Sequence, residues 1–371
     1  MERRQTFAEL FRSAGRFAAL LRELGVKPQD RVALLFPNVP MQVACYYGAL
    51  LAGAVVVQIN PLGSEKDMAH ALTDSGARVF VGLDVLLARF VGGLASPHLQ
   101  HVFVARIADE LPLSLRLGFA VKAWLGKVPL PPKGTGEDLG RRLAGLAPAL
   151  GPSPSAGGDV ALLQYTGGTT GAPKAAMLTH RNLAANVEQS RAWERADREG
   201  VDTALLAVPF FHVYGMTVGM NLSVRMARTM VLHARWETEP VMRSIQRHQA
   251  AIFPGVQMFY QKIIEHPRVK SYTLTSVRIC LSGAGPLMRE VQEVFERITG
   301  AKVVEGYGLT EASPVTHCNP LFGRRKVGTI GLPFPSTDAK LVDLEGGMRD
   351  VAGGEPGELI VRGPQVMQGY W

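Results

Sequence analysis

Cysteine is scarce in this sequence, which has three thiols in 371 residues. Cys45, Cys280 and Cys318 are an odd number, lack the spacing of a metal site and lie in or beside apolar runs. These features argue against a disulfide framework and predict buried free thiols in a reducing compartment.

Acidic residues are fewer than basic ones, 32 against 40, which gives a diffuse net charge of +8. Such a charge suits anionic small molecules or an anionic membrane surface as well as it suits nucleic acid. No DNA- or RNA-binding motif accompanies it, so we expect no nucleic-acid partner. The 40 glycines and 24 prolines follow no period, and 47% of the residues are hydrophobic. Together these values exclude collagen-like and disordered chains.

No uninterrupted apolar run has the length of a membrane span. The longest apolar stretch, residues 41–59, contains Gln42, Gln58 and Gly53 and ends in β-branched residues. A buried helix followed by a buried strand is the better interpretation. The N-terminus is polar and opens a helix, unlike a secretory signal, so we expect a cytoplasmic protein.

Apolar strand patterns alternate with amphipathic helix patterns through most of the chain. A Thr6–Glu9 capping box, apolar residues at helical spacing from Phe7 to Leu24, and a stop at Gly25 predict the first helix. Near-continuous apolar strands are expected at 31–36, 54–59 and 77–83. Strands of this kind between helices predict a parallel sheet that is covered on both faces.

The predicted fold class is α/β, with two doubly wound subdomains that have mainly parallel sheets and the start of a small β-rich barrel subdomain. The first subdomain is expected to span residues 1–155, with a Pro/Leu-rich insertion near 111–133. The second is expected at 156–326. The β-rich part, 327–371, is expected to be incomplete.

The most informative stretch is residues 165–180, YTGGTTGAPKAAMLTH, which follows an apolar strand and precedes a helix. It combines three glycines, three threonines and a lysine: Gly167, Gly168, Gly171, Thr166, Thr169, Thr170 and Lys174. Glycines let backbone N–H groups converge, and hydroxyls and a compact positive charge add further donors. This collection predicts a polyphosphate site.

A Walker A loop is the obvious rival, because Lys174 lies at the right distance from Gly168. However, Pro173 occupies the position of the second glycine, and Ala175 occupies that of the magnesium-binding Ser or Thr. The P-loop interpretation therefore fails at two positions.

In this setting the loop resembles the phosphate-binding signature of adenylate-forming enzymes: acyl-CoA synthetases, firefly luciferase and peptide-synthetase adenylation domains. Four more stretches resemble motifs of that family, in the family's order: AVPFFHVYGM (207–216), LSGAGPL (281–287), EGYGLTEAS (305–313) and GELIVRGPQVMQGYW (357–371). The similarity covers nearly the whole chain and is greatest to bacterial long-chain fatty-acid–CoA ligases.

The resemblance implies a nucleotide site that binds ATP and Mg²⁺. Glu311 and Thr170 would be metal ligands, Thr310 a phosphate contact, and Tyr307 the ring stacked on adenine. The remaining implied nucleotide contacts are the loop residues 166–171 with Lys174, and Gly283, Ala284, Gly285, Gly306 and Gly308. Taken alone, a glutamate after a strand is more often a solvated charge or a residue of a helix's first turn.

The resemblance also implies an acyl site. His212 would lie where the acyl chain meets the nucleotide, which makes Lys174, His212, Thr310 and Glu311 the implied catalytic set. Met216 falls where some long-chain enzymes have a tunnel gate, although it suits plain core filling equally well. The implied pocket lining is Gly255, Val256 and Phe259, with ordinary core as the alternative.

The sequence departs from the family at two places. Ala175 occupies a position where the family usually has glycine. The chain also stops at Trp371, before the family's Thr-Gly-Asp motif, its hinge, and the C-terminal domain that supplies an adenylation lysine and the coenzyme A channel. We therefore expect the large N-terminal part of a ligase. A truncated chain, a split gene and part of a longer protein all remain open.

The expected function is ATP-dependent activation of a long-chain fatty acid to acyl-AMP and then, with coenzyme A, to acyl-CoA. Two alternatives remain: an adenylate-forming ligase for another carboxylic acid, and a non-catalytic module that binds ATP or acyl-AMP. A homodimer is left open. Residues 111–133 combine apolar side chains with four cations and no acid. They predict either peripheral contact with a membrane or a helix packed on the main body with its cations outward.

Overall fold

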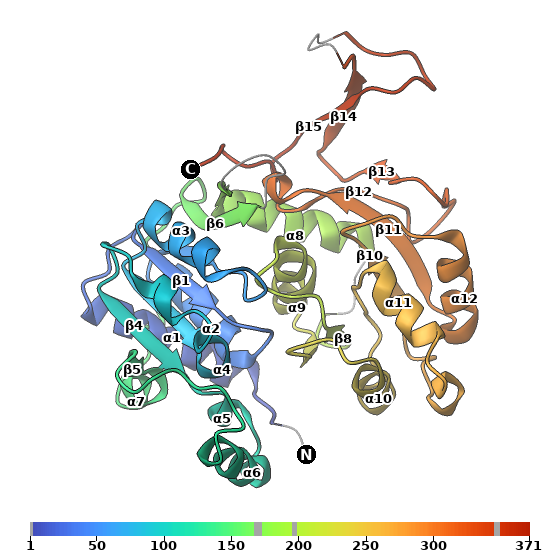
Figure 1. Cartoon of the computed structure of the whole chain (residues 1–371). Helices are drawn as coiled ribbons and strands as arrows, with labels where there is room; N and C mark the ends of the chain where they lie inside the picture. The colour runs from blue at the N-terminus through green and yellow to red at the C-terminus, as the bar shows by residue number, and fades with distance from the viewer. Residues whose placement is uncertain (1–2, 167–172, 195–198, 345–348) are drawn as a thin grey trace.

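The computed structural model describes residues 3–166, 173–194, 199–344 and 349–371 (Figure 1). It confirms an α/β protein with one large, mostly parallel sheet and smaller sheets. The seven strands of the large sheet run in the order β5-β4-β3-β1-β2-β6-β7, and all neighbours are parallel except β6 and β7. They are β1 (Arg31–Leu35), β2 (Val55–Gln58), β3 (Val79–Leu83), β4 (His101–Ala105), β5 (Glu137–Asp138), β6 (Val160–Thr166) and β7 (Lys174–Thr179).

Alternate residues of β1 face different layers, as the pleat of a strand requires. Val32 and Leu34 pack into the cluster that holds α1 (Phe7–Glu23) and α2 (Pro40–Leu51). Ala33 and Leu35 pack into a second cluster with α3 (Glu65–Ser75). The sheet is therefore covered on both faces, as predicted, and the Thr6–Glu9 capping box of α1 is present.

The second sheet is mixed. Strand β10 (Ile279–Ser282) is parallel to β11 (Lys302–Gly308), which is followed by the antiparallel strands β12 (Val315–Cys318) and β13 (Leu332–Pro333). The parallel pair β8 (Thr203–Leu206) and β9 (Thr229–Leu232) connects to β10 through bridges at Ile252. The ribbon of β14 (Asp338–Val342) and β15 (Glu358–Arg362) is antiparallel and projects from the body in Figure 1.

The remaining helical elements connect or cover these strands. They are α4 (Asp84–Leu87), η1 (Val91–Leu94), α5 (Ile107–Glu110), α6 (Leu113–Trp124), α7 (Leu139–Ala144), α8 (His180–Glu194), the π-helical η2 (Gly215–Asn221), α9 (Leu222–Arg225), α10 (Thr238–His248), α11 (Gln257–Ile264), η3 (Val269–Ser271), α12 (Arg289–Thr299) and η4 (Thr310–Ala312). Among the described residues, no helix is both long and apolar enough to cross a bilayer.

Strand β7 differs from the sequence prediction, which placed Lys174 in a loop that leads from a strand to a helix. Residues 174–179 instead pair antiparallel with β6 before α8 begins. On its other edge β7 receives the backbone of residues 368–371, from which the Trp371 N–H donates to the Ala175 carbonyl at 2.8 Å. This pairing supplies hydrogen-bond partners for main-chain groups of β7. Because the partner segment is so distant in the chain, no local sequence pattern predicts the strand.

All three cysteines are buried and free, as predicted. Strands β6 and β7 lie beyond residue 155 yet pair within the first sheet. The division into subdomains at 155/156 and 326/327, and the barrel that β14 and β15 would begin, stay predictions.

Candidate functional site

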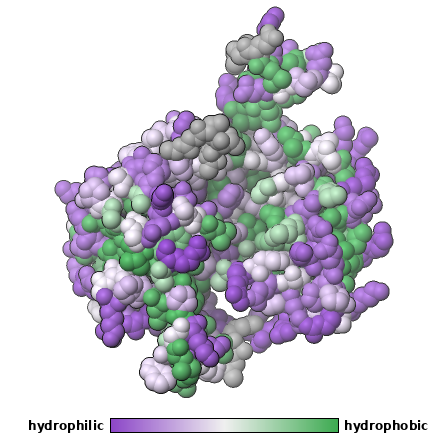
Figure 2. Space-filling view, viewed as in Figure 1, coloured by the Kyte–Doolittle hydropathy of each residue, from purple (hydrophilic) through white to green (hydrophobic). Residues whose placement is uncertain are grey.

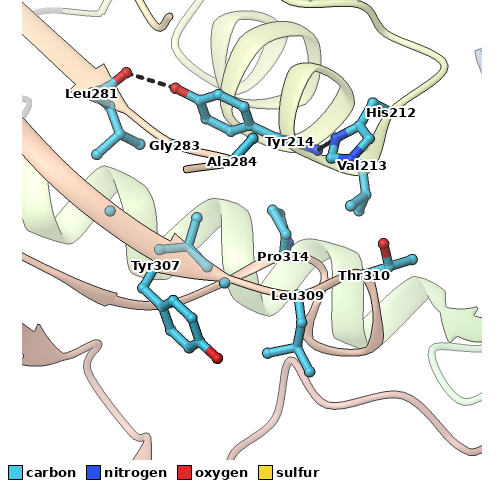
Figure 3. Close-up of a pocket in the computed structure, with 13 residues that line it drawn as sticks. His212, Val213, Tyr214, Leu281, Gly283, Ala284, Tyr307, Leu309, Thr310 and Pro314 are labelled. Atoms are coloured by element: carbon cyan, nitrogen blue, oxygen red, sulfur yellow. Dashed lines mark hydrogen bonds between the residues drawn. The ribbon is translucent and has the colours of Figure 1, made fainter. Parts of the chain in front are cut away.

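A pocket of about 290 Å³ opens between the end of β11, the loop after β10 and the segment that precedes η2 (Figure 3). Its wall includes seven of the residues predicted from the sequence: His212, Gly283, Ala284, Gly306, Tyr307, Gly308 and Thr310. Three segments that are distant in sequence therefore converge on one cavity, as the implied nucleotide site requires. Gly285, the remaining residue of the predicted adenine-side loop, is exposed and lies outside the lining.

The backbone is unusual at two of these positions. A Cβ atom on Gly308 would lie 2.2 Å from the Pro314 carbonyl oxygen, so no larger residue fits there without a shift. Ala284 has a left-handed backbone with φ of 61°, a conformation that is costly for a residue with a side chain. Backbone that is bare of side chains lets a flat ligand lie directly against the wall.

Tyr214 forms part of the pocket wall, although the sequence analysis assigned it no role. Its hydroxyl donates to the carbonyls of Leu281, at 2.7 Å, and Gly255, at 3.1 Å. Burial raises the pKa of this hydroxyl well above its ordinary value, so it keeps its proton and both hydrogen bonds. Tyr214 thus fixes the end of β10 against residue 255. The hint in the sequence was a side chain that ends in a hydroxyl within the apolar run 207–216.

His212 lines the same wall (Figure 3). Desolvation by neighbouring protein atoms lowers the pKa of the ring, although the side chain still presents accessible surface. The Tyr214 N–H donates to His212 Nδ1 at 3.3 Å, so Nδ1 carries no proton. In the neutral ring the proton is then on Nε2, which is able to donate to a ligand.

Tyr307 and Thr310 also line the pocket. The Tyr307 ring is partly exposed and meets His317 edge-on at 6.2 Å between centroids, so its accessible surface can stack on a planar ligand. Thr310 begins η4 and is half-buried.

Glu311 follows in η4 but lies outside the pocket lining. Its Oε1 accepts a hydrogen bond of 2.6 Å from the Tyr370 hydroxyl, and its main-chain carbonyl accepts one of 2.8 Å from Met367 N–H. The Glu311 carboxylate raises the pKa of the Tyr370 hydroxyl, which therefore remains a donor.

Tyr370 also contacts the predicted phosphate-binding lysine. Lys174 is exposed at the start of β7, and its Nζ lies 5.5 Å from the centre of the Tyr370 ring. Thr166 donates from Oγ1 to the Lys174 carbonyl at 3.3 Å. One tyrosine thus touches both Lys174 and Glu311. Neither contact of Tyr370 was predicted from the sequence.

The other phosphate-loop residues, Gly167, Gly168, Thr169, Thr170 and Gly171, lie outside the described residues. In the described part of the chain, no three His, Cys, Asp or Glu side chains form a group that could hold a metal ion. A cation near Glu311 would therefore share that carboxylate with ligand oxygens, which is the usual coordination of Mg²⁺ beside phosphates.

The predicted acyl-pocket residues lie behind this wall rather than on it. Met216 is fully buried in η2, and Phe259 stacks on Trp236 with 3.8 Å between ring centroids. Gly255 is buried, and a Cβ there would lie 2.9 Å from the Tyr260 hydroxyl. Val256 is half-buried. These contacts are those expected if the residues belong to the ordinary hydrophobic core, which was the alternative interpretation. An acyl-binding role for them stays a prediction.

Known proteins resemble this chain in sequence and fold. The family model described as AMP-binding enzyme matches residues 1–371. The chain is 39% identical over 376 residues to the long-chain-fatty-acid–CoA ligase of Bacillus subtilis (strain 168), covering 99% of this chain and 66% of that protein. The ATP-bound structure of MatB from Rhodopseudomonas palustris has a TM-score of 0.82 at 26% identity and covers 98% of this chain and 66% of that one. A benzoate CoA ligase from Burkholderia xenovorans LB400 has a TM-score of 0.83 at 26% identity, covering 99% and 68%. The chain thus spans about two thirds of the relatives' length.

Proposed function

This chain belongs to the AMP-binding enzyme family, and on that premise we propose that it activates a long-chain fatty acid by adenylation. The observation that carries the proposal is the convergence of His212, Tyr307 and Thr310 on one pocket, with Lys174 and Glu311 joined beside it by Tyr370. The resemblance to the Bacillus subtilis ligase supports the long-chain acid as substrate.

In the proposed reaction a fatty-acid carboxylate oxygen attacks the α-phosphorus of ATP. The bond from that phosphorus to the pyrophosphate oxygen breaks, so acyl-AMP forms and pyrophosphate leaves. A carboxylate is a poor electrophile, and the attached AMP supplies a leaving group for later transfer to coenzyme A. That second step belongs to the proposal for the complete protein.

Each pocket group has a part in this scheme. Tyr307 stacks on the adenine, while the backbone of Gly283 and Ala284 lies against its edge. The Thr310 hydroxyl and the Lys174 ammonium donate to phosphate oxygens. His212, neutral because its pKa is lowered, donates from Nε2 to an oxygen at the reacting centre. Donors aimed at developing charge are usually the largest catalytic contribution.

The residues present fit a magnesium ion in one respect, since Glu311 offers a partly buried carboxylate next to phosphate-binding donors. Glu311, with Thr170 outside the described residues, would hold the ion, which supplies charge neutralisation on the phosphate oxygens. Coenzyme A, a homodimer and a cytoplasmic location remain predictions.

The first test is calorimetric titration of the chain with ATP·Mg²⁺. Lys174→Ala and Glu311→Ala each remove a charge-assisted contact worth about 1.5–3 kcal/mol. We expect binding to weaken roughly tenfold to a hundredfold in each variant. Lys122→Ala, which removes an exposed cation on α6, is the control and should bind like the parent. Parent-like affinity in both site variants would refute the assigned roles.

The second test distinguishes the acid. Non-hydrolysable hexadecanoyl and benzoyl sulfamoyl-adenosines are titrated in parallel. Tighter binding of the hexadecanoyl compound supports the proposal, and tighter binding of the benzoyl compound supports the aryl alternative, which the likeness to a benzoate CoA ligase raises. Pyrophosphate release from ATP with palmitate then separates an enzyme from a binding module.

A further inference from the structure

Helix α6 turns an apolar stripe towards the solvent. Its members are Leu113, Leu117, Val121 and Trp124, with side chains 78%, 76%, 56% and 84% exposed. Their spacing of four, four and three residues puts them on one face of the helix, while Leu115, which is 52% exposed, lies on another side. No residue of α6 is buried. Figure 2 shows the hydrophobic surface of this helix at the lower end of the molecule, where α6 lies in Figure 1.

The inner side of the helix is held by Arg116. Its Nε donates to the Leu111 carbonyl at 3.0 Å and its Nη2 to the Asp109 carbonyl at 3.2 Å, next to α5. Arg116, Phe119 and Ala123 are half-buried. A roll that buried the apolar stripe would break these hydrogen bonds and expose Phe119. The helix thus packs on the body through this side with Lys122 exposed, as the alternative interpretation expected, but its apolar stripe is left facing the solvent.

The charges around the stripe have one sign. Residues 111–133 contain Arg116, Lys122, Lys127 and Lys133 and no aspartate or glutamate. The three lysines are exposed. An apolar face with a tryptophan and flanking lysines is the composition of helices that lie in the interface of an anionic bilayer.

We propose that α6 docks the protein on anionic membrane surfaces. The twelve-residue helix, about 18 Å long, lies parallel to the surface, with its stripe at the boundary of headgroups and acyl chains and its lysines at lipid phosphates. This inference stands independently of the proposed function. If both hold, the surface brings the enzyme to the place where a long-chain fatty acid partitions.

A second copy of the chain is the main competing occupant. In a two-fold dimer the same patch meets itself, so the three exposed lysines of one segment would approach those of the other, with no carboxylate in the segment to pair with them. The charge pattern therefore favours a lipid surface.

The test is co-sedimentation of the whole chain with vesicles of equal parts phosphatidylcholine and phosphatidylglycerol, against phosphatidylcholine alone. We expect sedimentation with the anionic vesicles and its loss at high salt. Lys122→Glu/Lys127→Glu should weaken binding at least about tenfold at low salt, since each cation near such a surface contributes roughly 1 kcal/mol. Leu117→Ser/Trp124→Ser should abolish it.

Leu62→Ser is the matched control, because Leu62 is 77% exposed but lies outside α6, and it should bind like the parent. Circular dichroism checks that each variant is folded. The proposal is overturned if the parent fails to sediment at low salt, if the α6 variants bind like the parent, or if sedimentation equilibrium shows a dimer that Leu117→Ser/Trp124→Ser dissociates while vesicle binding is absent.

Discussion

At the residue scale, Tyr370 connects two charged groups that lie far apart in the sequence. Its hydroxyl donates to Glu311 Oε1, and its ring faces Lys174 Nζ. The hydrogen bond fixes one carboxylate oxygen and leaves the other available to a ligand. The ring holds the ammonium by a cation–π contact, which is worth about 0.5–1 kcal/mol at an exposed site. Tyr370 therefore acts as a positioning residue for both groups.

Substitution separates the two contacts of Tyr370. Tyr370→Phe keeps the ring and loses the hydroxyl, so we expect weaker ATP binding in the presence of Mg²⁺, by about threefold to tenfold, and unchanged binding of ATP in EDTA. Tyr370→Leu loses both contacts and should weaken binding in both conditions. Calorimetry of the two variants checks this. Equal losses in Tyr370→Phe with and without Mg²⁺ would count against a role through Glu311.

Residues with roles carried by a local motif were predictable, whereas residues with roles set by distant partners were not. His212, Tyr307 and Thr310 stand in motifs that resemble the family's, and the structure brings all three to one pocket. Tyr214 and Tyr370 act through hydrogen bonds to Leu281 and Glu311, which no local pattern reveals.

At the element scale, the close approach of β11 and β12 shapes the pocket. The two strands are antiparallel with an irregular register at Tyr307 and Gly308, where the Pro314 carbonyl occupies the space of a side chain. A bulge of this kind redirects side chains next to a site. The position of Tyr307 therefore depends on an empty Cβ position one residue later.

Gly308→Ala should destabilise the protein by about 1–3 kcal/mol, because the new methyl group must displace main-chain atoms. It should also weaken ATP binding by moving Tyr307. Gly145→Ala is the matched control, since no atom lies within 4 Å of its Cβ position and its φ is −92°. Thermal denaturation and calorimetry measure both effects. A parent-like melting temperature for Gly308→Ala would contradict the packing argument.

Elements with local signals were predictable in the same way. The capping box of α1 and its end before Gly25, which has a φ of 70°, are present as predicted. Strand β7 was missed because its short, alanine-rich stretch is extended only by pairing with β6 on one side and residues 368–371 on the other. Tertiary pairing overrides weak local preference.

At the scale of the whole molecule, one hydrophobic cluster joins the large sheet to the region of β8 and η2. It contains Phe17 and Val32 from the layers of the large sheet, Leu206 from β8, and Phe210 and Met216 from the chain that follows β8. A buried ion pair lies where α8 meets the approach to β9, with Arg228 1% and Glu194 11% exposed. Removing one partner of such a pair destabilises a protein far more than replacing both partners with apolar residues.

Arg228→Ala should therefore cost about 3–5 kcal/mol, since it leaves the Glu194 carboxylate buried without its partner. Arg228→Met/Glu194→Leu should recover most of this loss. Arg362→Ala is the exposed control, because its pair with Asp338 is 87% and 72% accessible and contributes less than about 1 kcal/mol. Urea denaturation compares the variants, and similar midpoints for Arg228→Ala and Arg362→Ala would contradict the expectation.

Residues 368–371 complete the outer edge of β7, the strand that begins with Lys174. During translation, α8 and the whole second sheet leave the ribosome before this edge receives its partner. Until then the Ala175 and Met177 carbonyls and the Met177 N–H have no main-chain partner on that side. Nascent chains that end before residue 368 should therefore present an open sheet edge to chaperones, and Lys174 would reach its place only after residues 368–371 have emerged.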